Sequence, residues 1–182
     1  MRQDRCVSYP AWAYFPRQTA APPWVRDFLQ VVERHRGRLD STTHKTLESD
    51  RVVATLRDDL VSAGWSVEAG KLASDKITRP VLFGDNGTVR VKQEIDGWHP
   101  VLRIVLEVES GRAWMGNAIY RDLVRASLVA DARYLALGVR QVYEYGAGTT
   151  SRDFEKTRDT LDSIYASGRL ALPFAGVLIF GW

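Results

Sequence analysis

The run Val101–Glu109 constrains the fold of this chain more than any other segment. Its even-numbered positions are all apolar, and Val105, Glu107 and Glu109 share the opposite face. The apolar stretch is typical of a strand that is buried on both faces, at the centre of a sheet covered by helices. The two carboxylates come at the end of this strand, which is where α/β proteins build their sites. The segment therefore predicts a buried strand that carries Glu107 and Glu109 to the edge of an α/β sheet.

A second alternating run precedes this one. Over residues 89–96 one face holds Val89, Val91, Gln93 and Ile95, and the other holds Arg90, Lys92, Glu94 and Asp96. Same-face residues on a strand lie about 6.6 Å apart, twice the rise of about 3.3 Å per residue. If the two runs are neighbouring strands, Asp96, Glu107 and Glu109 share one small volume. Carboxylates at such short separations raise one another's pKa values unless a cation neutralises them. We therefore expect a hard divalent ion, Mg²⁺ with Mn²⁺ as a substitute.

The same residues carry a resemblance to a known family. Asp96, a ten-residue gap and Glu107-x-Glu109 are followed by Gly116-Asn117-x-x-Tyr120-Arg121-Asp122-Leu123. This pattern resembles the PD-(D/E)XK signature of the restriction-endonuclease-like superfamily, in the variant with Glu in place of the usual Lys, as in BamHI-like type II restriction endonucleases. The resemblance covers about residues 45 to 140. It implies an αβββαβ core with a mixed central sheet flanked by helices, and hydrolysis of DNA with Mg²⁺.

The resemblance also assigns roles to individual acids. Asp96 and Glu107 correspond to the shared metal ligands and catalytic acids. Glu109 takes the place of the usual Lys, where it would hold a second ion or orient the attacking water. Glu48 matches a helical acid that helps to bind metal, with Asp50 as the competing candidate. An acid near the positive N-terminus of a helix is an alternative explanation for Glu48, and acids kept at a strand end for solubility are an alternative for the others.

Cationic and amide side chains near the acids suggest contacts with DNA phosphates. Arg112, Asn117 and Arg121 follow the second strand, with Asn117 and Arg121 one helical turn apart, and such a cluster could clamp the phosphate backbone. A structural ion pair, for instance with Asp122 or Asp131, would explain the same residues. Lys92 shares a face with Asp96 and could supply the missing cation or contact a phosphate, although a lysine on a strand surface is usually only solvated.

Two further residues near the motif have competing explanations. His99 lies three residues after Asp96 and could be a general base, but a lone histidine in a loop is more often incidental. Glu94 could form an ion pair with Arg103 instead of approaching a metal.

Periodicity and turn residues divide the rest of the chain into elements. An irregular aromatic arm is expected over residues 1–22 and a flexible link over 146–150. Helices are expected over about 23–36, 45–63, 115–130 and 151–166, and further strands over 65–69, 133–142 and 177–180. This order predicts one nuclease-like domain over residues 1–182, with an N-terminal arm and helix over 1–44 and a catalytic core over 45–145.

Composition narrows the setting. The chain has 182 residues, a net charge of +3 and a single cysteine, Cys6. One cysteine cannot form an internal disulfide, which fits a reducing cytoplasm. No run approaches the roughly 18 apolar residues of a membrane span, and nothing resembles a signal peptide, so no membrane partner is expected. A mildly basic chain permits DNA as a partner without requiring it.

The predicted function is that of a Mg²⁺-dependent DNA endonuclease acting in restriction or defence. The resemblance implies a homodimer, because a two-fold assembly matches a palindromic site. Two alternatives remain: a catalytically inactive nuclease fold that binds DNA or protein, for which the missing Lys is the best support, and a subunit of a larger defence complex.

Overall fold

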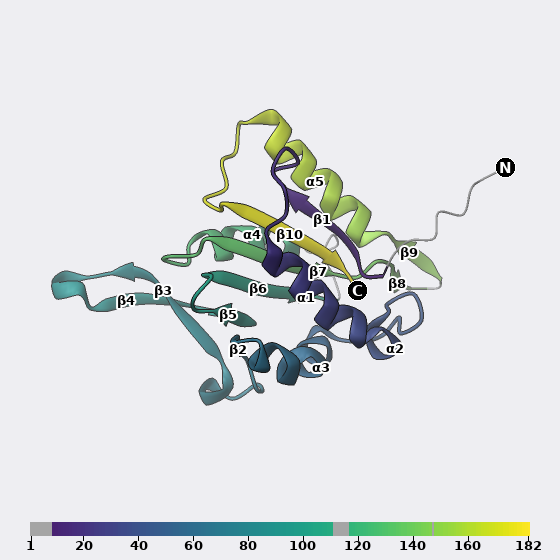
Figure 1. Ribbon diagram of the computed structural model, residues 1–182, viewed down its shortest axis with the longest axis horizontal. Helices are drawn as coiled ribbons and strands as arrows, with labels where there is room; N and C mark the ends of the chain where they lie inside the picture. Colours follow the sequence, from purple (N-terminus) through teal and green to yellow (C-terminus); the bar gives the residue numbers. More distant parts are fainter. Residues whose placement is uncertain (1–8, 111–116, 147) are drawn as a thin grey trace.

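A mixed six-stranded sheet forms the centre of the protein, in a computed structural model that describes residues 9–110, 117–146 and 148–182. The strand order is β1-β10-β7-β6-β5-β2, and helices cover both faces (Figure 1). The expected α/β class, with a mixed sheet flanked by helices, is confirmed. The strands of this sheet are β1 (Ala11–Phe15), β2 (Ser66–Val67), β5 (Gly97–His99), β6 (Ile104–Glu109), β7 (Tyr134–Val139) and β10 (Gly176–Gly181).

The three central strands β6, β7 and β10 are parallel, and the strands that flank them, β1 and β5, run in the opposite direction. β7 pairs in parallel with both β6 and β10, while β1 is antiparallel to β10, β5 to β6 and β2 to β5. The central strands are apolar on both faces, as strands between two helical layers must be. β6 is the strand predicted from the run Val101–Glu109, although it begins only at Ile104. The acids Glu107 and Glu109 therefore lie at its carboxyl end, beside Leu137 and Val139 of β7.

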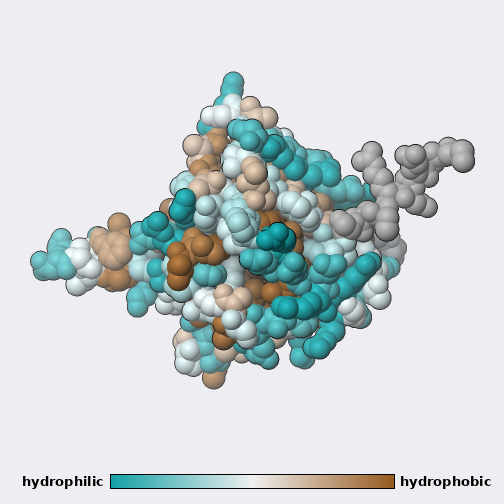
Figure 2. All heavy atoms as spheres, in the orientation of Figure 1, coloured by the Kyte–Doolittle hydropathy of each residue, from teal (hydrophilic) through white to brown (hydrophobic). Residues whose placement is uncertain are grey.

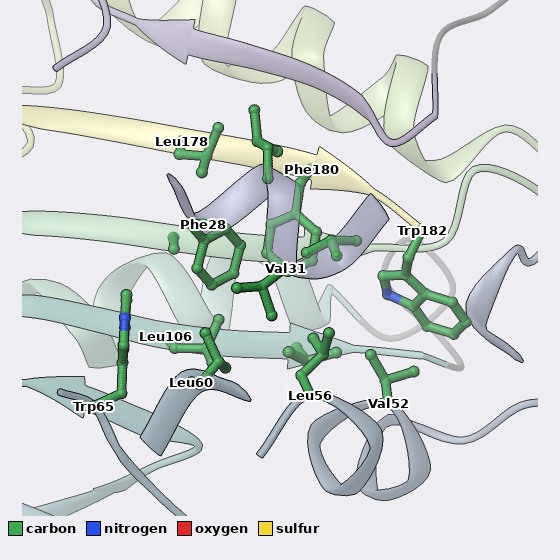
Figure 3. Close-up of a cluster of buried hydrophobic side chains, with 14 of the residues drawn as sticks. Phe28, Val31, Val52, Leu56, Leu60, Trp65, Leu106, Leu178, Phe180 and Trp182 are labelled. Carbon is green, nitrogen blue, oxygen red and sulfur yellow. The ribbon is translucent and has the colours of Figure 1, made fainter. Parts of the chain in front are cut away.

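Each face of the sheet has its own hydrophobic core. Helices α1 (Pro23–Arg34) and α3 (Ser49–Ser62) cover one face, and Figure 3 shows their side chains meeting those of the central strands. Helices α4 (Ala118–Ser127) and α5 (Asp153–Ser167) cover the other face. The short helix α2 (Arg36–Leu39) follows α1. Because Val105, Glu107 and Glu109 share the second face of β6, their side chains lie on the side of α4.

A two-stranded hairpin projects from this body. β3 (Ile77–Phe83) pairs with β4 (Val89–Ile95), and the tip extends well beyond the central sheet (Figure 1). The hairpin carries four large apolar side chains that are each about half exposed: Leu82, Phe83, Val89 and Val91. Figure 2 shows hydrophobic surface on this projecting hairpin. A smaller hairpin joins β8 (Tyr143–Tyr145) to β9 (Thr149–Ser151), where a flexible link was expected. Among the helices of the described residues, none is both long enough and apolar enough to cross a lipid bilayer.

The pairing predicted for the two acid-bearing runs is wrong over most of its length. β4 pairs with β3, and only the short β5 that follows it pairs with β6. The register of β5 and β6 would set Asp96 opposite Glu107, but the ladder ends at Gly97 and Leu106. There the Asp96 carboxylate accepts the Val108 N–H that a backbone carbonyl would otherwise take. The chain before Asp96 leaves the sheet at this point and forms the projecting hairpin.

The irregular arm predicted at the N-terminus is also wrong where the structure describes it. Ala11–Phe15 form the edge strand β1, which pairs with the last strand of the chain. The alternation of this segment was hidden by its aromatic and proline-rich flanks. The helices predicted over 23–36, 45–63, 115–130 and 151–166 are present with shorter bounds, and the strands over 133–142 and 177–180 correspond to β7 and β10.

Candidate metal-binding site

A polar cavity of about 230 Å³ lies at the carboxyl end of β6. Its lining includes six carboxylates, from Glu68, Glu94, Asp96, Glu107, Glu109 and Asp122. Three cationic side chains, from Lys76, Arg121 and Arg125, line it as well. We call this space the acid cavity. Its excess of acidic over basic groups makes it a place where a further cation would be bound favourably.

Asp96 is fixed at the point where the hairpin leaves the sheet. Its Oδ2 accepts a hydrogen bond of 2.7 Å from the backbone N–H of Val108, and its backbone oxygen accepts one of 2.9 Å from the N–H of Glu68. Burial, together with the charges of Glu68 and Asp122, raises the pKa of the Asp96 carboxyl to about 7, although the Val108 hydrogen bond and the charge of Lys76 act to lower it. The carboxyl group is thus held in place but only partly ionised near neutral pH.

Glu107 is the most isolated acid of the cavity. The residue is 6% exposed, and its Oε1 is buried without a hydrogen-bond partner among the described residues. Burial raises the pKa of Glu107 well above its usual range, with further increases from the charges of Asp96 and Asp122. A buried carboxylate oxygen without a donor costs free energy, so it is a ready ligand for a cation.

Glu109 and Asp122 share one arginine. The Arg121 Nη2 lies 3.1 Å from Glu109 Oε2, and its Nε lies 3.2 Å from Asp122 Oδ1. The structural ion pair with Asp122 that was the alternative explanation for Arg121 is therefore present. Burial raises the pKa of Asp122, while the charge of Arg121 opposes that shift. Because Arg121 engages the Glu109 carboxylate, Glu109 does not orient a water molecule in this arrangement as a free acid would.

The acid cavity is also lined by a lysine, Lys76, that the motif did not indicate. The Lys76 Nζ lies 2.6 Å from Oε2 of Glu68, which is 6% exposed. Arg125 lies near the base of the projecting hairpin, where its Nη2 donates to the backbone oxygen of Glu94 at 3.1 Å. The cavity is therefore lined by residues that follow β2, precede β3, end β4 and β6, and lie on α4.

Three of the predicted site residues that the structure describes, Glu48, Lys92 and Asn117, do not line the acid cavity. Glu48 is the N-cap residue of α3 and lines a neighbouring cavity of about 410 Å³ with Ser110 and Arg140. Its competitor Asp50 pairs with Lys71 at 3.0 Å. Lys92 is exposed on β4, opposite Pro80 on the projecting hairpin, because that strand leaves the sheet before Asp96.

The predicted phosphate contacts are only partly placed. Asn117 is the exposed N-cap residue of α4, in the left-handed conformation with φ 54°, and its backbone oxygen accepts from the N–H of Arg121 at 3.1 Å. The predicted spacing of one helical turn between the two is therefore present. Arg112 lies outside the described residues.

His99 and Glu94 do not take the roles considered for them. His99 pairs with Ile104 at the start of β6, the opposite end of that strand from Glu107, and its ring packs edge-on against Trp65. Burial lowers the pKa of His99. Glu94 lines the acid cavity, and no ion pair with Arg103 is found within the described part of the chain.

The chemistry of the cavity fits a hard divalent cation, although its side chains do not yet form a coordination shell. Across residues 9–110, 117–146 and 148–182, no three His, Cys, Asp or Glu side chains are arranged to hold a metal ion. The available donors are carboxylate oxygens, which Mg²⁺ and Mn²⁺ prefer, and Glu107 offers an unpartnered one. A bound ion would need Asp96 and Glu107 to lose their protons, because the pKa values of both are raised.

Sequence analysis missed Glu68, Lys76, Asp122 and Arg125 as site residues. One signal could have found Asp122: it is the single charged residue among the buried positions Ala118, Ile119, Asp122, Leu123 and Ala126 of α4. A carboxylate at a buried helical position is rarely unpaired, so it indicates a polar site. Glu68 and Lys76 have no such pattern, because they lie in the irregular segments next to short strands.

No model of a known protein family matches the chain, and comparisons with curated proteins and with solved structures find no significant match either.

Proposed function

We propose that the protein is a Mg²⁺-dependent DNA endonuclease that hydrolyses phosphodiester bonds, in restriction or another defence against foreign DNA. The observation that carries this proposal is the pair Asp96 and Glu107. Both are held at the carboxyl end of β6 in a polar cavity, and burial raises the pKa of both. Perturbed carboxyl groups that meet in a cavity are typical of functional sites.

The element order around the pair supports the same proposal. Apart from the segment with the projecting β3–β4 hairpin, which is inserted between β2 and β5, the chain order is α3, β2, β5, β6, α4 and β7, and these strands are neighbours in the order β2-β5-β6-β7. That order agrees with the αβββαβ core that the resemblance to PD-(D/E)XK nucleases implies. The resemblance places the metal ligands at Asp96 and Glu107, the two acids that meet in the cavity.

In this proposal Asp96 and Glu107 hold Mg²⁺. The ion would supply a water of lowered pKa and positive charge against the phosphate. The Val108 N–H holds the Asp96 carboxylate in place before any ion binds. Arg121 could release Glu109 when a phosphate binds, because it is half exposed and faces the cavity. A homodimer would allow both strands of a duplex to be cut, and the single cysteine suits the cytoplasm.

Cleavage of a supercoiled plasmid tests the proposal. Wild-type protein with Mg²⁺ or Mn²⁺ should nick or linearise the plasmid, and EDTA should prevent it. Glu107→Gln and Asp96→Asn should lower the rate by about 10³-fold or more, because each removes a charged metal ligand without changing shape. Glu33→Gln is the matched control, since Glu33 is exposed on α1 and does not line the acid cavity. An uncut plasmid, or equal cutting by Glu107→Gln, would contradict the proposal.

A DNA-binding protein without catalysis is the second candidate. The ion pair between Arg121 and Glu109 favours this second candidate, because Glu109 stands at the motif position of the usual Lys and is held there by an arginine. Such a protein should shift labelled duplex DNA in a gel and leave the plasmid intact with either metal. Cleavage abolished by Glu107→Gln would exclude this candidate.

A further inference from the structure

The acid cavity contains a lysine from outside the motif, and its position is defined by the register of the projecting hairpin. Ile77 pairs with Ile95 in the last pair at the base of the hairpin, so Lys76 stands one step further, opposite Asp96. The Lys76 side chain is 23% exposed and lines the acid cavity together with Asp96 and Glu107. The hairpin therefore carries an ammonium group to the place where the motif lacks one.

Lys76 is held by a short chain of contacts that ends on Asp96. Its Nζ lies 2.6 Å from Glu68 Oε2, and the N–H of Glu68 donates to the backbone oxygen of Asp96 at 2.9 Å. An ammonium group has three N–H donors. Within the described part of the chain Lys76 makes one side-chain hydrogen bond, to Glu68, so two donors remain for a ligand.

The other two cations of the cavity are already engaged. Arg121 bridges Glu109 and Asp122, and Arg125 donates to the backbone oxygen of Glu94. Lys92 lies out on the hairpin and does not line the cavity. Among the described residues that line the cavity, Lys76 is the one that carries an ammonium group.

We infer that Lys76 is a catalytic residue of the proposed phosphodiester hydrolysis, with Glu68 as its positioning residue. Its ammonium would donate to the attacking water or to a phosphate oxygen and stabilise the negative charge that grows there as the water oxygen bonds to phosphorus and the bond to the leaving oxygen breaks. The water would give its proton to an ionised carboxylate of the acid cavity, and the leaving oxygen would take a proton from solvent. This inference rests on the proposed function, and it gives Lys76 the role that was considered as one possibility for Lys92.

Plasmid cleavage by Lys76→Met tests this role. We expect the cleavage rate at saturating DNA and Mn²⁺ to fall by about 10²-fold, the usual cost of losing one donor to a developing charge. Mn²⁺ should bind at least as tightly as in the wild type, measured by calorimetry, because a positive charge beside Asp96 has been removed. Lys71→Met is the matched control: Lys71 also pairs with an acid, Asp50, but does not line the acid cavity.

The double variant Lys76→Met with Glu68→Gln separates catalysis from simple neutralisation. If Lys76 only balances the buried charge of Glu68, removing both charges should restore cleavage. A catalytic Lys76 predicts that the double variant folds, by its thermal unfolding, and still cleaves slowly. Should Lys76→Met alone unfold, this double variant and Lys76→Arg, which keeps the charge and should retain part of the rate, decide the matter.

The two proposals can fail separately. Wild-type cleavage with an unchanged rate in Lys76→Met or in the double variant would overturn the role of Lys76 and leave the nuclease in place. A wild-type protein that does not cleave DNA would overturn both.

Discussion

At the scale of single residues, the acid cavity brings together carboxyl groups whose ionised form is disfavoured by burial. Burial raises the pKa values of Asp96, Glu107 and Asp122, and each acid charge raises those of its neighbours. In their ionised form, these carboxyl groups do not stabilise the folded state. Ionising these buried carboxyl groups costs free energy, and a bound cation can offset that cost. Carboxyl groups with perturbed pKa values are common at functional sites.

The first prediction at this scale concerns pH. A carboxyl group whose pKa is raised by folding binds more protons in the native state than in the unfolded chain, so stability falls as pH rises through the interval between the two pKa values. For Asp96 that interval runs from its ordinary value of 3.8 to about 7. In EDTA, we expect the free energy of unfolding in urea to be lower at about pH 8 than at about pH 5.

Glu107→Gln provides the comparison for this pH effect. The substitution removes one of the raised groups, so the fall in stability with pH should be shallower than in the wild type. Identical pH profiles for the two proteins would mean that Glu107 is ionised in the fold and that its burial has little effect on its pKa.

At the scale of elements, β7 is packed too closely for any side chain at one position. Gly138 pairs with Val108 on β6 and with Phe180 on β10, and a Cβ built there would lie 2.5 Å from Cζ of Phe180. We predict that Gly138→Ala lowers the free energy of unfolding by about 1–3 kcal/mol, the usual cost of overpacking a core.

Urea denaturation measures this cost, with Gly37→Ala as its control. Gly37 lies in the short helix α2, where a Cβ meets nothing within 4 Å, so that substitution should be neutral or slightly stabilising. Equal stability of Gly138→Ala and the wild type would show that the Phe180 ring can move aside.

The elements that sequence analysis predicted are those with a strong period. The two-sided apolar pattern of β6, and the placing of Val105 and Glu107 on one face, follow directly from alternation and are present in the structure. The pairing partner of residues 89–95 could not be predicted, because alternation defines faces but not neighbours. At the point where the ladder between β5 and β6 ends, the Asp96 carboxylate accepts the N–H of Val108, a side-chain contact that alternation does not predict.

The candidate site was predictable only in its motif. Asp96, Glu107 and Glu109 line one cavity, as their spacing suggested, whereas Lys76 and Glu68 arrive through the base of the hairpin and the end of β2. Their positions depend on contacts between segments that are distant in sequence from β6. Glu48 shows the converse, since its place near a helix N-terminus matched the motif and yet it lines a different cavity.

At the scale of the whole molecule, binding of a cation should be linked to folding. The acids of the cavity come from the residue after β2, from the ends of β4 and β6, and from α4. An ion bound by these acids would therefore link the central sheet and α4 to the projecting hairpin. Ligand at 100 times its dissociation constant stabilises a protein by about 2.7 kcal/mol. We predict that Mn²⁺ raises the melting temperature, more at about pH 8 than at about pH 6, because bound carboxyl groups must first lose their protons.

Thermal unfolding with Mn²⁺ or EDTA measures this linkage. Asp96→Asn should abolish most of the shift, while Glu33→Gln should keep it, since Glu33 does not line the acid cavity. A shift of equal size in Asp96→Asn would place the ion elsewhere in the molecule.

The hydrogen bond from Val108 has a consequence for how freely this region can vary. Every amino acid except proline supplies a main-chain N–H, so the aim of the Asp96 carboxylate does not depend on which side chain position 108 carries. Interior packing can drift at that position over many generations while the acid keeps its direction. Only an imino acid there would release it.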